Sequence, residues 1–236
     1  MLRKKEAHVW SASLGEMPPV QMERLRQGLS DDELRRAERF RFPGDRDHYI
    51  IARGILRAIL AGYLNMKPEE VRFSYGPFGR PELAGDAGKK LCFSVSHSNG
   101  LALYAVVKGR RVGVDIEYIR SDIMVEDIAR QFFTPSENIL LETCPGQARN
   151  KAFFTLWARK EACLKAQGTG LAEAGALMKA DRDASWSLAD LDVKRGYAAA
   201  IAVEGRGIGL RCRQWVSGAP RIRRLAQGPR GVFRIV

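Results

Sequence analysis

Two carboxylates lie two residues apart in the run V-G-V-D-I-E, residues 112–117, where Asp115 and Glu117 alternate with apolar side chains. In an extended strand, residues two apart project from the same face, about 6.6–6.8 Å apart along the strand. Such a pair is suited to hold one small, hard cation. Mg²⁺ is typically bound by one or two protein carboxylates, and the phosphate oxygens of a substrate complete its shell. An ordinary strand with a polar end would show the same pattern.

A second pair of charged residues, Glu161 and Lys165, lies one turn apart in the segment 148–167, where apolar residues recur at helical spacing. A Glu–Lys pair at this spacing is usually a surface ion pair that contributes about 0.3–0.5 kcal/mol. On a helix, however, Glu161 falls between Trp157 and Phe154, at the edge of the apolar face. A half-buried carboxylate there requires a cation or a proton, so both interpretations stay open.

Other residues are suited to contact phosphate groups. The segment 73–81, F-S-Y-G-P-F-G-R-P, predicts a turn whose free backbone amides lie beside Arg80. Ser96 and His97 close the strand-like run 91–97. A base adjacent in sequence to a serine is poorly placed to activate it, so we interpret both residues as phosphate or ribose contacts and not as a nucleophile with its base. An ordinary tight turn and an ordinary strand end would look much the same.

Two predicted helices place arginines near these candidates. The capping-box pattern Ser30–Glu33 begins a helix that includes Arg36 among four arginines, and residues 45–64 form a long helix with Arg53 beside its apolar stripe. Each of these arginines could equally belong to a solvated face, with its stem buried against the protein.

The remaining patterns predict a mixed α+β protein. Strands are expected at 8–14, 91–97, 101–107, 112–117, 191–195, 197–203 and 210–216, and helices at 19–29, at 125–133, from Thr134 onward and at 148–167. Helices followed by strands occur twice, which is compatible with two similar α+β halves, residues 1–112 and 113–236. The second half ends in a basic tail with five arginines between Arg221 and Arg234.

Composition narrows the class of protein. The chain has 236 residues, 45% of them hydrophobic, and its longest apolar run, 101–107, is far too short to cross a membrane. No signal-peptide pattern is present at the start, so we expect a cytoplasmic protein without membrane contact. Four scattered cysteines and three histidines argue against a zinc site or a disulfide framework. The net charge of +12 predicts a polyanionic partner: nucleic acid, an anionic lipid surface, a phosphate-rich cofactor or an acidic protein.

The ordered set of motifs resembles one known family. V-G-V-D-I-E followed about forty residues later by W-A-R-K-E-A-C-L-K is similar to the signature of the two-domain 4′-phosphopantetheinyl transferases of the surfactin-synthetase-activating type. The segments D-H-Y-I-I-A-R-G-I-L-R, F-G-R-P, F-S-V-S-H-S, F-F-T-P-S-E and G-T-G-L resemble family counterparts in the same order, so that the resemblance covers residues 30–171.

The resemblance implies a pseudo-twofold monomer that binds coenzyme A between its halves. Asp115, Glu117 and Glu161 would then hold Mg²⁺, or Mn²⁺, against the diphosphate of coenzyme A. The expected phosphate and nucleotide contacts are Arg53 and His97 at the 3′-phosphate end, Arg80 and Ser96 at the nucleotide and diphosphate, Lys165 at a phosphate oxygen, and Arg36. Two departures bear on adenosine binding: the family often has lysine at the position of Arg80, and Glu33 lies where some members have a basic residue.

The reaction implied by the resemblance attaches the 4′-phosphopantetheinyl group of coenzyme A to a serine of an apo carrier protein and releases 3′,5′-ADP. We expect a metal and Lys165 to stabilise the developing charge, and Glu161, or a metal-bound water that it orients, to accept the serine proton. Carrier domains are typically acidic around this serine, so a basic enzyme would be steered toward them. The alternatives are an adaptor that binds coenzyme A without turnover, and a basic nucleic-acid-binding protein, for which no known binding module is found.

Overall fold

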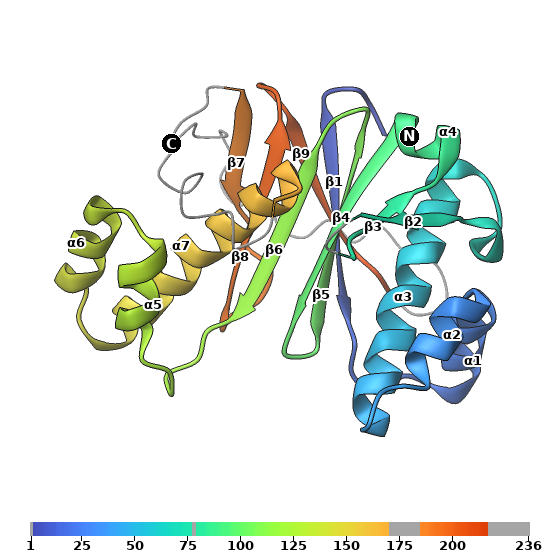
Figure 1. The fold of residues 1–236 in the computed structure, drawn as a ribbon, viewed down its shortest axis with the longest axis horizontal. Helices are drawn as coiled ribbons and strands as arrows, with labels where there is room; N and C mark the ends of the chain where they lie inside the picture. Colours follow the sequence, from blue (N-terminus) through green and yellow to red (C-terminus); the bar gives the residue numbers. More distant parts are fainter. Residues whose placement is uncertain (1, 77–78, 170–184, 217–236) are drawn as a thin grey trace.

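Two β-sheets face each other at the centre of the molecule, and a long helix covers the outer face of each (Figure 1). The computed structural model describes residues 2–76, 79–169 and 185–216. The layers follow the order helix, sheet, sheet, helix. This arrangement confirms a mixed α+β fold in two halves.

The first half is built on a four-stranded sheet with β1 in its interior. In spatial order its strands are β4 (Leu91–Ser98), β5 (Leu101–Lys108), β1 (Glu6–Ser13) and β9 (Gly209–Gln214). The other elements of this half are α1 (Pro19–Gln27), α2 (Asp31–Ala37), α3 (Pro43–Leu64), the 3₁₀ helix η1 (Pro68–Glu70), the hairpin of β2 (Phe73–Tyr75) and β3 (Pro81–Leu83), and α4 (Gly85–Lys90). Because α3 packs on one face of the sheet and the second sheet on the other, all residues from Ala102 to Val107 in β5 are buried, which explains their uninterrupted apolar run.

The second half has a three-stranded antiparallel sheet covered by α7. Its elements are β6 (Val112–Tyr118), α5 (Val125–Phe132), α6 (Pro135–Thr143), α7 (Gly146–Gln167), β7 (Trp186–Asp190) and β8 (Tyr197–Glu204), with β8 between β6 and β7. A stripe of alanines on α7 packs on alanines of β8, and α5 and α6 pack on the other side of α7. Small side chains bring α7 close to the sheet.

Local signals account for several element ends. Thr134 accepts a hydrogen bond from the Glu137 amide and Pro135 is the first residue of α6, as the capping-box pattern predicted. Gly168 ends α7 with φ of +79°, the left-handed conformation that glycine adopts without strain. The strand expected at 191–195 is wrong: the ladder with β8 ends at Asp190, and residues 191–196 form the connection to β8, turning at Gly196. The buried Leu191, whose amide donates to the Ala199 carbonyl at 2.8 Å, and the partly buried Val193 pack in the core from this connection.

The chain returns to the first sheet at its end. The strand expected at 210–216 is present as β9, but β9 pairs in parallel with β1 and so belongs to the sheet of the first half. The basic tail with Arg221 and Arg234, and Phe78 and Leu171 of the motifs, lie outside the described residues. Within the described ranges, no helix is long and apolar enough to cross a membrane.

Candidate active site

Strands β4 and β6 lie side by side where the two halves meet, and serine side chains join them. The Ser94 hydroxyl accepts a hydrogen bond of 3.1 Å from the Val114 amide, and the Ser98 hydroxyl accepts one of 3.1 Å from the Tyr118 amide. Serines at alternate positions of β4 project from one face, so all three of its serines point toward β6. This seam places Ser96 opposite Asp115.

A triangle of polar groups from three elements forms the centre of the site. Ser96 of β4 donates to Asp115 Oδ1 of β6 at 2.8 Å, and the ammonium of Lys165 on α7 lies 2.6 Å from the same oxygen and 3.0 Å from the Ser96 hydroxyl. Asp115 is 2% exposed, and its second oxygen, Oδ2, has no hydrogen-bond partner among the described residues. A buried carboxylate oxygen without a donor is costly, and a bound cation would remove that cost.

Glu117 and Glu161 add negative charge around this triangle. Burial, followed by the charge of Asp115, raises the pKa of Glu117, although Ser98 donates to its Oε2 at 3.1 Å. Burial and the charges of Asp115 and Glu117 likewise raise the pKa of Glu161. Three carboxylates thus lie around a single ammonium, that of Lys165, and the charge of Asp115 contributes to the raised pKa of both glutamates.

The carboxylates are suited to a hard divalent cation, although they are not arranged around one. Within the described ranges, no three His, Cys, Asp or Glu side chains are grouped so that they could hold a metal ion. The donors themselves fit: Asp115 has one free buried oxygen, and Glu117 and Glu161 are carboxylates held in an excess of negative charge. Mg²⁺ and Mn²⁺ prefer such oxygen ligands.

Close packing of α7 on β6 positions the two helical residues of the site. A Cβ atom placed on Gly113 would lie 1.9 Å from the Ala162 carbonyl oxygen, so only glycine fits where the helix crosses the strand. Asp115 lies two residues beyond this contact on β6, while Glu161 and Lys165 flank Ala162 on α7. The glycine of V-G-V-D-I-E therefore sets the distance at which the helix presents its carboxylate and its ammonium.

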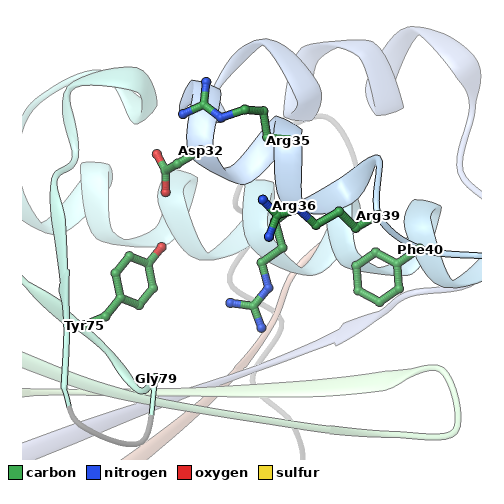
Figure 2. A pocket seen from close by; sticks show the side chains of 7 residues that line it. All are labelled: Asp32, Arg35, Arg36, Arg39, Phe40, Tyr75 and Gly79. Atoms are coloured by element: carbon green, nitrogen blue, oxygen red, sulfur yellow. The ribbon is translucent and has the colours of Figure 1, made fainter.

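A pocket rich in arginine opens on the first half (Figure 2). Its volume is about 690 Å³, and three guanidinium groups line it, two from helix α2 and one from Arg39 just after this helix. The lining residues are Asp32, Arg35, Arg36, Arg39, Phe40, Tyr75 and Gly79. Arg36, predicted as a phosphate contact, lies in this pocket, with its guanidinium 5.7 Å from the centre of the Tyr49 ring.

Arg53 contacts Tyr75, one of the residues that line the pocket, and is held by two further side chains. Its Nη2 donates to the hydroxyl of Tyr75 at 2.7 Å, its Nε pairs with Glu33, and its guanidinium stacks 4.2 Å from the centre of the Phe73 ring. Glu33 is 1% exposed and also binds Arg57 at 2.6 Å. Glu33, interpreted from the sequence as a departure in adenosine binding, thus forms a buried ion-pair network, and Arg57 is a member that sequence reasoning missed.

The last two predicted residues, His97 and Arg80, are not among those that line the arginine pocket. His97 is exposed at the surface. Partial burial of its ring lowers its pKa, and the charges of Lys165 and then His48 lower that pKa further. Arg80 donates to backbone carbonyls at the seam. The structure therefore brings Ser96, Asp115 and Lys165 into direct contact, whereas the roles predicted for His97 and Arg80 toward a nucleotide stay predictions.

Comparison with known proteins covers both halves of the chain. Residues 111–202 match the family described as the 4′-phosphopantetheinyl transferase superfamily, and residues 17–109 match the family described as 4′-phosphopantetheinyl transferase, N-terminal. The chain is 41% identical over 217 residues to the 4′-phosphopantetheinyl transferase HetI of Nostoc sp., which covers 87% of this chain and 91% of that protein. It is 27% identical over 149 residues to a 4′-phosphopantetheinyl transferase of Bacillus subtilis, covering 63% of this chain and 64% of that protein.

Proposed function

Because the chain belongs to the 4′-phosphopantetheinyl transferases, which are enzymes, we propose that it moves this group from coenzyme A to a serine of an apo carrier protein, with a divalent cation, and releases 3′,5′-ADP. The observation that supports the site most directly is the buried oxygen Oδ2 of Asp115, which has no hydrogen-bond partner among the described residues. The other oxygen of this carboxylate, Oδ1, holds Ser96 and Lys165.

Three carboxylates would hold the cation, namely Asp115, Glu117 and Glu161. When bound there, Mg²⁺ or Mn²⁺ would stabilise negative charge on the diphosphate oxygens of coenzyme A. The Lys165 ammonium and the Ser96 hydroxyl lie at the same oxygen of Asp115, so a diphosphate at this seam would meet two donors. Both groups are held by the fold before the reaction begins, which is the condition for effective electrostatic stabilisation.

The arginine pocket is suited to the nucleotide end of coenzyme A. Its three guanidinium groups would bind the 3′-phosphate, and the rings of Phe40 and Tyr75 offer apolar surfaces for the adenine. Arg53 would support this end through Tyr75, because its own guanidinium is already paired with Glu33. We assign His97 to the same nucleotide end.

Transfer requires the removal of one proton and the cleavage of one phosphoanhydride bond. The serine oxygen of the carrier forms a bond to the β-phosphorus of coenzyme A, the bond from that phosphorus to the bridging oxygen breaks, and 3′,5′-ADP leaves with that oxygen. We assign the serine proton to Glu161, the carboxylate of the site that lies on α7. Lys165 would stabilise charge on the phosphate oxygens during the step.

Charge complementarity supports an acidic partner. The net charge of +12 would speed the encounter with an acidic carrier domain, and the association rate should fall as salt screens it. A nucleic-acid ligand would show a salt dependence too, but its binding would not depend on Asp115, Glu117 or Glu161.

Intact-mass spectrometry tests the proposal. An apo carrier protein incubated with this enzyme, coenzyme A and Mg²⁺ should gain one phosphopantetheinyl group on serine, and EDTA should prevent the gain. Glu161→Gln should abolish turnover with an unchanged fold, whereas Glu142→Gln, at an exposed position on α6, should not. Transfer that continues in EDTA would contradict the role of the divalent cation. Transfer by Glu161→Gln at the wild-type rate would contradict the role of Glu161. No gain on several carriers, together with nucleic-acid binding that Asp115→Asn leaves intact, would favour the other class of function.

A further inference from the structure

Arg80 joins three elements at the seam between the two halves. Its Nη1 donates to the backbone carbonyl of Lys165, and its Nη2 donates to the carbonyls of Val112 at 3.0 Å and Phe93 at 3.4 Å. These carbonyls belong to α7, β6 and β4, the elements from which the central triangle is built. The side chain is partly buried, so its donors serve the protein backbone where water would otherwise bind.

The carbonyl of Lys165 is one that a helix cannot satisfy by itself. The last four carbonyls of an α-helix have no intrahelical donor, and α7 ends at Gln167. The amides of both Gly168 and Thr169 donate to the carbonyl of Leu164, the residue before Lys165. Arg80 therefore supplies the donor that Lys165 needs, and it places a positive charge at the negative end of the helix dipole.

We propose that Arg80 is a positioning residue that caps α7 from across the seam and so holds the Lys165 ammonium against Asp115 and Ser96. The cap fixes the backbone of the residue whose side chain forms the 2.6 Å and 3.0 Å contacts of the triangle. The same guanidinium binds Val112, three residues before Asp115 on β6, so that the strand and the helix are held by one group. The catalytic consequence rests on the proposed function, whereas the capping does not.

Arginine is the side chain that this geometry requires. Its planar guanidinium offers five donors in a fixed fork, and it can reach carbonyls of three elements at once. Lysine has a compact ammonium on a flexible stem and would satisfy fewer of them with less defined geometry. We therefore expect Arg80→Lys to give an effect between those of wild type and Arg80→Met, which keeps an apolar stem and removes every donor.

Hydrogen exchange measured without substrate tests the capping directly. In Arg80→Met, the amides of residues 162–169 should exchange faster than in wild type, while those of α3 should not change. Arg72→Met is the matched control, because Arg72 is an exposed arginine just before β2 in the same part of the chain. If exchange at residues 162–169 in Arg80→Met equals that of wild type, the proposal is wrong. Should Arg80→Met fail to fold, Arg80→Lys and Arg80→Gln take its place in the same comparison.

Kinetics separate positioning from direct contact with coenzyme A. A displaced Lys165 should lower kcat by about 10–100-fold and change KM for coenzyme A by less than about twofold, because a 1 Å misplacement of a catalytic group costs on the order of 100-fold. In a Lys165→Met background, Arg80→Met should cause little further loss, since the two residues act through one group. A tenfold rise in KM with unchanged kcat, or losses that multiply, would overturn the proposal and favour a nucleotide contact. If the wild-type protein transferred no phosphopantetheinyl group, the proposed function would be refuted. The hydrogen-exchange comparison would then still test whether Arg80 caps α7.

Discussion

The close contact between β6 and α7 predicts a large effect from the addition of a single methyl group. In Gly113→Ala, the new Cβ would lie 1.9 Å from the Ala162 carbonyl oxygen and 2.5 Å from the Ala166 amide nitrogen, both in the backbone of α7. Ordinary contact begins at 3.4 Å, so the helix would have to move away by roughly 1.5 Å, because neither strand nor helix backbone can yield locally.

The displacement should reduce both stability and turnover. Overpacking of a core contact costs about 1–3 kcal/mol of unfolding free energy. Because Glu161 and Lys165 move with α7 and Asp115 stays on β6, the 2.6 Å contact between the ammonium and the carboxylate would break. A shift of this size should lower kcat by about 100-fold or more. Initial rates from intact-mass spectrometry and urea unfolding of the same sample measure the two effects.

Gly62→Ala is the control for the loss of a helical glycine. Gly62 lies in α3 and a Cβ atom there would meet no atom within 4 Å. This variant should gain about 0.5–1 kcal/mol of stability, since alanine is favoured over glycine inside a helix, and it should keep the wild-type rate. If Gly113→Ala behaved like Gly62→Ala, the inference that this glycine sets the distance between β6 and α7 would be refuted.

Three further perturbations test the seam and the buried charges. Ser94→Ala removes the acceptor of the buried Val114 amide and should lower the unfolding free energy by about 1–3 kcal/mol in urea titrations, so an unchanged midpoint would contradict the bridging role of the serine. Glu33→Gln leaves the buried Arg53 and Arg57 without a countercharge and should lower the unfolding free energy by about 3–5 kcal/mol in the same titrations. A loss below about 1 kcal/mol would show that water reaches these ion pairs. Burial lowers the pKa of His8 from 6.5 to about 4, so between these pH values the unfolded chain binds a proton that the folded chain does not. The contribution of His8 to the unfolding free energy should be complete above pH 6.5 and fall by about 2 kcal/mol by pH 5. A His8→Gln variant whose stability falls equally steeply with pH would contradict this.

The sequence predicted the elements of the site better than their contacts. Period-two alternation placed Asp115 and Glu117 on one face of β6, and helical periodicity placed Glu161 and Lys165 on α7, because these patterns depend on neighbouring residues only. The pairing of Lys165 with Asp115 depends on how α7 packs on β6, and no pattern of neighbouring residues could predict a contact between residues fifty positions apart. The G of V-G-V-D-I-E was the available signal, since a glycine inside a strand often marks a close approach of another backbone.

Residues with two possible roles were the hardest to predict. Glu33 fits a capping box, and it does bind the Ser30 amide at 3.0 Å, but its burial against Arg53 and Arg57 follows from the packing of α2 on α3. Leu191 alternates with charged residues as in a strand, yet its side chain fills the core from the connection between β7 and β8. The capping box is therefore present but is only part of the role of Glu33, whereas the strand predicted at 191–195 is wrong, because tertiary packing decided what each side chain contacts.

The seam explains why the polar chemistry lies where it does. Strands within each sheet exchange backbone hydrogen bonds, whereas β4 and β6 are joined through Ser94, Ser96 and Ser98. Side chains that bridge two strands leave room for groups that backbone pairing would exclude, and here that room holds Asp115 and the ammonium of Lys165. The same bonds therefore hold the halves together and arrange the charges. A substitution at the seam should thus affect turnover and stability together, whereas a substitution of equal cost in the core of either half, away from the seam, should affect stability alone.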